Sequence, residues 1–206
     1  AQTALDTTAA GDVWDNGFAY DSVDYVKMKS SSASGSSINY TLPTLMDGVA
    51  LAASYSPSGT STVSTTGFSA TYTGVEGLSV SYGLSENGST VAGASGDVST
   101  MKGSYAIGSF TAAYSSTESD KNAAGTDEEM SSFKLSYTVT DDLSISYGEE
   151  THETDGSSLD EEFEAISVSY TTGGMTITAA QYDASNLANT AGQTAERWKL
   201  GLAFAF

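Results

Sequence analysis

Most of the seven basic side chains fall in segments where polar and apolar residues alternate. Four of them occupy polar positions of the alternation, at Lys102, Lys134, Arg197 and Lys199. In a strand of period two, these side chains would share a face with the Ser and Thr residues around them. Cations on a Ser/Thr surface attract anions and orient dipolar solutes, so the chemistry expected of them is electrostatic.

Acidic side chains are almost absent from the alternating segments and gather in the long connections between them. Hard divalent cations take carboxylate oxygens as ligands, so two acidic runs are candidate sites for structural Ca²⁺ or Mg²⁺. These runs comprise Asp127, Glu128 and Glu129, and Asp160, Glu161 and Glu162. An alternative stays open, in which these acids only solvate the surface. Four more acids stand near the beginning of the chain, at Asp12, Asp15, Asp21 and Asp24.

Catalytic chemistry finds little support in the residue types present. The chain has no cysteine, and its one histidine, His152, stands between Glu150 and Glu153. Acidic neighbours stabilise an imidazolium ion, which suits a solvated cation better than a general base. The sequence contains neither a metal-ligand spacing motif nor a phosphate-binding loop. We therefore expect that the protein is not an enzyme.

Composition excludes further classes of protein. The 206 residues carry 26 acidic and 7 basic side chains, a formal net charge of −19, which would repel a nucleic acid. Apolar runs are far shorter than the roughly 20 residues that a transmembrane helix needs. Charged residues make up 16%, below the usual value of about 25% for soluble domains. Ser, Thr, Gly and Ala fill the difference, and the chain is poor in Leu, Lys and Arg, which disfavours packed helices.

Alternation of apolar and polar residues recurs throughout residues 36–206 and marks strands with two unlike faces. Eleven such strands can be counted, the last running from Trp198 to Phe206. Short turns and long polar loops alternate between them, as in an antiparallel up-and-down meander. Long loops are expected at 56–64, 85–96, 115–129, 148–162 and 183–194. A shift in the apolar series between Ala179 and Tyr182 predicts a β-bulge there.

Ten of the twelve tyrosines fall in pairs that flank the short turns. They are Tyr40, Tyr55, Tyr72, Tyr82, Tyr105, Tyr114, Tyr137, Tyr147, Tyr170 and Tyr182. Amphipathic rings at both ends of an apolar band are typical of the aromatic girdles of transmembrane β-barrels. The apolar band is also narrow and includes small residues, which lipid tolerates better than a close-packed core does. The sequence therefore favours a membrane barrel over a soluble or surface β-sandwich adhesin, which stays the alternative.

Two stretches carry a resemblance to a known family. The end of the chain, WKLGLAFAF at 198–206, resembles the terminal strand of bacterial outer-membrane proteins. The stretch SINYTLPTLMDGVALAASY at 37–55 is similar to the hairpin that follows the constriction loop in general, trimeric, sixteen-stranded porins of Gram-negative bacteria. The resemblance implies that the eleven strands are the sixth to the sixteenth. Residues 1–35 would then be a remnant of the constriction loop or an irregular N-terminal segment.

The resemblance also sets expectations for function, location and partners. It implies an outer-membrane porin that forms a water-filled channel for passive diffusion of ions and small hydrophilic solutes. Long loops would be extracellular and short turns periplasmic. The partners would be outer-membrane lipid, lipopolysaccharide, two further copies in a homotrimer, and the barrel-assembly machinery that reads Phe206. Because eleven strands cannot close a barrel of even strand number, we expect an incomplete chain or a twelfth strand within 21–29.

Overall fold

The computed structural model describes residues 37–43, 45–57, 64–87, 95–121 and 127–205. These residues form eleven strands in one antiparallel sheet, each paired with its neighbours in sequence order. The strands are β1 (Ile38–Thr41), β2 (Val49–Ser56), β3 (Thr65–Tyr72), β4 (Leu78–Asn87), β5 (Ser95–Ile107), β6 (Phe110–Lys121), β7 (Glu128–Thr140), β8 (Leu143–Thr154), β9 (Glu161–Thr172), β10 (Met175–Ser185) and β11 (Ala195–Phe204). The expected all-β, antiparallel meander is confirmed.

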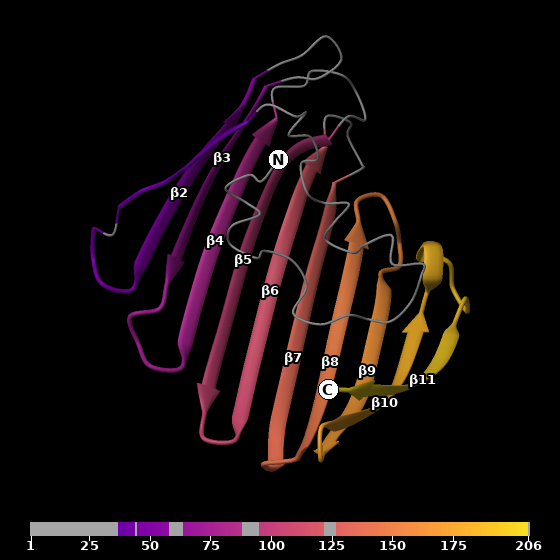
Figure 1. The fold of residues 1–206 in the computed structure, drawn as a ribbon. Helices are drawn as coiled ribbons and strands as arrows, with labels where there is room; N and C mark the ends of the chain where they lie inside the picture. The colour runs from indigo at the N-terminus through magenta and orange to yellow at the C-terminus, as the bar shows by residue number, and fades with distance from the viewer. Residues whose placement is uncertain (1–36, 44, 58–63, 88–94, 122–126, 206) are drawn as a thin grey trace.

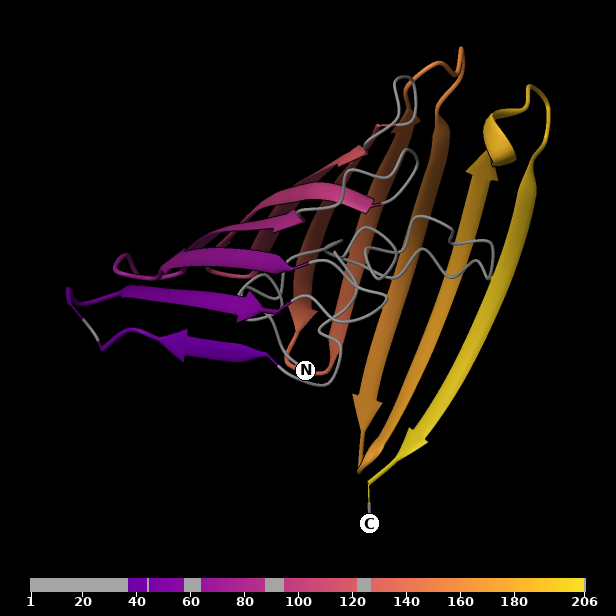
Figure 2. The same cartoon turned by 90° about the horizontal axis from the view of Figure 1, so that it is seen from above.

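The sheet is strongly curved into a trough, with β2 and β11 toward its two sides and the middle strands at its back (Figures 1 and 2). Short turns join the strands at one end, and longer connections join them at the other. Within the described residues β1 pairs only with β2, and β11 pairs only with β10. The backbone groups along the free edge of each of these two strands therefore have no partner strand among the described residues.

The two faces of the sheet differ in chemistry because successive side chains point to opposite sides. Large apolar and aromatic residues stand exposed on one face, for example Phe133, Leu135 and Tyr137 of β7. Ser, Thr, Gly and Ala occupy the other, as in the cross-strand pair of Ser146 and Ser167. We call the first the outer face and the second the inner face. A core in the usual sense is small and lies where β9 and β10 meet.

Several strands extend well beyond their sequence-based limits. The expected loop at 115–129 is strand up to Lys121 and again from Glu128, and the expected loop at 148–162 is strand up to Thr154 and again from Glu161. Beyond the apolar band, residues 115–121 and 148–154 are polar on both faces, so the alternation disappears there while the hydrogen-bonded ladder continues. The short and long connections do alternate as expected, but the long ones are shorter than the sequence suggested.

The prediction of a β-bulge between Ala179 and Tyr182 is wrong. Strand β10 keeps an unbroken register with both β9 and β11 through this region. Register shifts occur elsewhere, between Ser95 and Val98 and between Thr138 and Thr140.

A 3₁₀ turn, η1 (Leu187–Asn189), begins the connection from β10 to β11, and Asn186, Ala188 and Asn189 in and beside it have positive φ. None of the helices among the described residues has the length and apolar character needed to span a membrane.

Candidate functional site: the inner face of the sheet

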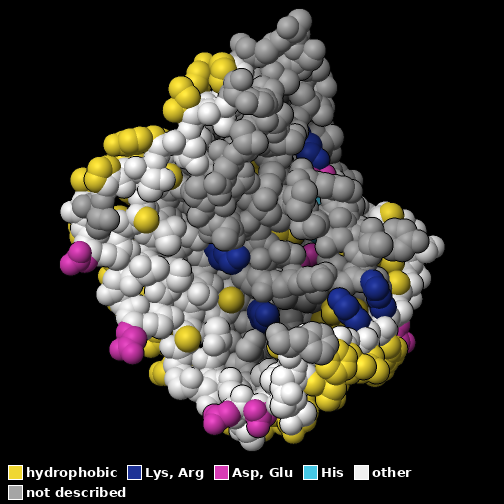
Figure 3. Space-filling view, in the orientation of Figure 1, with side chains coloured by type: hydrophobic (Ala, Val, Ile, Leu, Met, Phe, Trp, Pro, Cys, Tyr) yellow, Lys and Arg dark blue, Asp and Glu magenta, His cyan; other side chains and the backbone are white. Residues whose placement is uncertain are grey.

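All four basic residues singled out from the sequence lie on the inner face. Register places Lys134, Gly148, Ala165, Tyr182 and Arg197 opposite one another in one row across β7 to β11. Lys199 lies one inner-face position further toward the turn end of β11. Lys102 stands on β5 between Ser81 and Ser115. Lys and Arg side chains accordingly appear on the concave side of the trough (Figure 3).

The middle of this row is hollow. Gly148 and Ala165 stand between the long side chains of Lys134 and Tyr182 and leave a cavity of about 200 Å³. Two hydroxyl groups at its edge, Ser146 Oγ and Ser167 Oγ, lie 2.7 Å apart and share a hydrogen bond.

Nearer the loop end, the inner face carries acids and the histidine. His152 on β8 is 6% exposed, and its Nδ1 lies 2.9 Å from Oε2 of Glu161, which is 5% exposed. The expected solvated position is therefore wrong: His152 is buried against a carboxylate. Both residues, with Glu128, line a larger cavity of about 850 Å³ beneath η1. The sequence carried a signal for this position, because His152 and Glu150 continue the period of two set by Ser144, Ser146 and Gly148.

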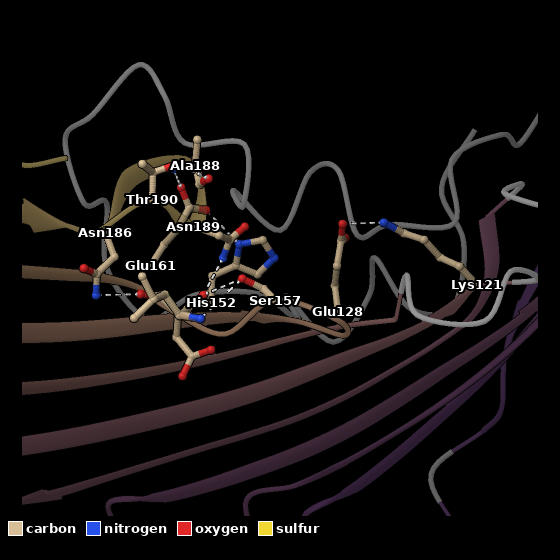
Figure 4. Close-up of polar contacts among 11 residues, drawn as sticks. Lys121, Glu128, His152, Ser157, Glu161, Asn186, Ala188, Asn189 and Thr190 are labelled. Atoms are coloured by element: carbon tan, nitrogen blue, oxygen red, sulfur yellow. Dashed lines mark hydrogen bonds and ion pairs between the residues drawn. The ribbon is translucent and has the colours of Figure 1, made fainter. Parts of the chain in front are cut away.

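Glu161 also holds the β10–β11 connection. The backbone N–H of Ala188 donates to Glu161 Oε1 at 2.6 Å. Asn186 Nδ2 donates to the Asp160 carbonyl at 3.1 Å, and Asn189 Nδ2 donates to the Leu159 carbonyl at 2.8 Å. The connection is thereby folded over the loop ends of β8 and β9 (Figure 4). A turn with positive φ at non-glycine residues is costly, and these contacts offset that cost.

The structure does not assemble the expected metal sites. Glu128 forms an ion pair with Lys121, and Glu161 bonds to His152 and Ala188 (Figure 4). Since Glu161 and Glu162 are neighbours in one strand, their side chains point to opposite faces. Across the described ranges no group of three or more potential ligands is arranged to hold a metal ion. Asp12, Asp15, Asp21, Asp24 and Phe206 lie outside the described residues.

Nine of the ten tyrosines lie on the outer face, between 36% and 58% exposed, in rows near each end of the apolar band. Tyr182 is the exception and corrects the expectation of a tenth girdle residue. It lies on the inner face, only 8% exposed, and packs with Phe163, Ala165 and Ala184. The aromatic residue type suggested a girdle position, but strict alternation along β10 sends this ring inward.

The outer face has the form of a lipid-facing band. On β7 its exposed apolar residues run from Phe133 to Val139, about 20 Å along a strand, against about 25 Å for the apolar band of known membrane barrels. The band ends where acids begin on the same face, as at Glu129 and Glu149. An apolar outer face on a sheet with a polar, cationic inner face defines the wall of a membrane β-barrel.

Comparison with known proteins agrees with this class. A family model described as Gram-negative porin matches residues 1–187, so the chain belongs to that family. The anion-selective porin of Comamonas acidovorans has a similar fold, with a TM-score of 0.63 and 16% identity over 82% of this chain and 59% of its own. A porin structure refined at 1.8 Å gives a TM-score of 0.58 and 15% identity, over 82% of this chain and 60% of its own.

The outer-membrane protein OmpT of Vibrio cholerae, folded in vitro, gives a TM-score of 0.57 and 15% identity, over 98% of this chain and 72% of its own. The chain thus spans about 60% of the length of the first two porins it resembles. Comparison with curated proteins gives no match. Family membership and these folds support a location in the outer membrane.

Proposed function

We propose that these strands form part of the wall of a closed, water-filled barrel through which ions and small hydrophilic solutes diffuse passively across the outer membrane. The observation that carries the proposal is the division of one continuous sheet into an exposed apolar face and a polar face with cations. In lipid the outer face needs no further covering, and the inner face needs water. The protein is then a passive channel without catalytic chemistry.

The proposal extends to residues outside the described ranges and to partners. Residues 1–35 supply a constriction loop whose acids, Asp12, Asp15, Asp21 and Asp24, face the basic wall across the pore. Opposed charges across a narrow aqueous gap orient dipolar solutes and filter ions. The assembled protein is a homotrimer in lipid and lipopolysaccharide, with its long connections extracellular and Phe206 read by the assembly machinery.

Single-channel recording of Lys134→Glu tests the luminal position of the inner face. We expect a shift of permeability from anions toward cations, because the substitution changes the charge at a half-buried point of the wall by two units. Lys121→Glu is the matched control: it makes the same charge change at the loop end of β6, next to Glu128. Equal selectivity in Lys134→Glu and the parent, or a protein that folds without detergent, would overturn the proposal.

A further inference from the structure

The ammonium group of Lys134 lacks an anionic partner in the part of the chain that the structure describes. Lys121 has Glu128 as its ion-pair partner, whereas no ion pair or hydrogen bond of Lys134 occurs among the described residues. The side chain is also half-buried, so water screens it incompletely. A cation that forms no ion pair with the described residues of the wall can take an anion from solution.

The hollow beside Lys134 has the size and lining for a small anion. Its volume of about 200 Å³ lies below the range of roughly 300–1,000 Å³ that holds drug-sized ligands. Its floor comes from Gly148 and Ala165, which leave room where larger residues would fill the wall. The buried ring of Tyr182 closes the far side, about 14 Å from β7 because three strand spacings separate them.

The paired serines supply a hydrogen-bond donor. Ser146 and Ser167 have two hydroxyl protons between them, and their mutual hydrogen bond uses one. The second proton remains for an acceptor at the edge of the same hollow. Acids of the inner face lie nearer the loop end, at Glu150 and Glu161, so the hollow is lined by one cation and no carboxylate.

We propose that this hollow is a binding subsite for small organic monocarboxylates. The carboxylate pairs with Lys134 and accepts the free Ser146/Ser167 proton, while a short alkyl chain lies over Gly148 and Ala165. The subsite deepens the proposed channel function and rests on it, because a solute reaches the hollow only from the lumen. It would make the channel retain carboxylates, whereas chloride, which is smaller and makes fewer of these contacts, passes.

The test is conductance of the purified protein in planar bilayers, in potassium chloride with increasing potassium butyrate. We expect butyrate to reduce the chloride current in a saturable way. Lys134→Gln should raise the half-blocking concentration about tenfold, because a charge-assisted contact is lost. Ala165→Leu fills the hollow and keeps the charge, and it should weaken the block similarly. Lys199→Gln is the matched control, since it removes a charge from the same wall outside the hollow and should leave the block unchanged.

The outcomes separate the subsite from the channel. Normal chloride conductance with no saturable block, or a block equally weakened by Lys199→Gln, would overturn the subsite and leave the porin function standing. A half-blocking concentration of butyrate that stays unchanged in both Lys134→Gln and Ala165→Leu would also overturn the subsite. Absence of any conductance in the parent protein would overturn both proposals.

Discussion

Removing the carboxylate of Glu161 should release the β10–β11 connection from the wall. This side chain accepts two hydrogen bonds from different elements, one from His152 Nδ1 and one from the backbone of Ala188. Hydrogen bonds to a charged group are worth about 1.5–3 kcal/mol each. Glu161→Ala loses both, but Asn186 and Asn189 still hold the connection. We therefore expect a local loss of about 3 kcal/mol, or roughly 100-fold in the opening equilibrium.

Amide hydrogen exchange at Ala188 measures this opening directly, because the amide proton is itself one of the two donors. We expect protection to fall about 100-fold in Glu161→Ala. In Glu161→Gln, protection at Ala188 should fall only about tenfold. The amide oxygen of the glutamine can still accept from Ala188, while its NH₂ group donates to the other tautomer of the His152 imidazole. Glu153→Ala is the control: its side chain is exposed on the outer face of β8.

Unchanged protection at Ala188 in Glu161→Ala would refute the reasoning, because it would mean that the carboxylate does not hold the turn. Equal loss in Glu153→Ala would refute it too, since the effect would then follow from the removal of any local acid.

Two further perturbations test the division of faces and the tight turns. Leu135→Arg, on the outer face between Phe133 and Tyr137, should cost about 2–4 kcal/mol of folding free energy in lipid bilayers, whereas Ser136→Arg on the inner face should cost less than about 1 kcal/mol. Reversible unfolding in liposomes measures both costs, and equal costs would contradict the assignment of faces. Gly77 has φ +76°, and Gly77→Ala would place a Cβ 2.2 Å from the backbone oxygen of Ala106, whereas a Cβ at Gly108, with φ +57°, has no atom within 4 Å. Gly77→Ala should therefore be more destabilising than Gly108→Ala by at least about 1 kcal/mol in the same assay. A smaller difference would mean that the turn adjusts freely.

The strand pattern could be predicted from sequence where lipid imposes it. Between Phe133 and Tyr137 one face must be apolar and the other polar, so the alternation is strict and identifies the strand and its faces. Beyond the band the outer face is polar too, so that constraint disappears, even where the inner face is buried, as at Ser115 and Thr117. The stretch from Ser115 to Lys121 therefore looks like a loop although its backbone continues the ladder with β5 and β7.

The same limit explains which parts of the inner face were missed. Lys134 and Lys102 were identified because they interrupt a Ser/Thr face within the alternating band. The contact of His152 with Glu161 depends on the register of β8 with β9 across a connection, which no local pattern encodes. Tyr182 was assigned to the wrong face because an aromatic residue resembles a girdle residue, although its position relative to Ala180 already indicated the inner face.

Net charge alone misrepresents what a solute inside the trough would meet. The chain carries −19 overall, yet many strand acids, such as Glu129, Glu149 and Glu162, point outward above the apolar band. On the inner face, acids lie toward the loop end, and Lys134 and Arg197 lie further along the wall. A solute entering from the loop side would therefore pass Glu150 and Glu161 before it reached these cations. Opposite charges in succession along one wall select by dipole and charge distribution, which a uniformly acidic or basic wall cannot do.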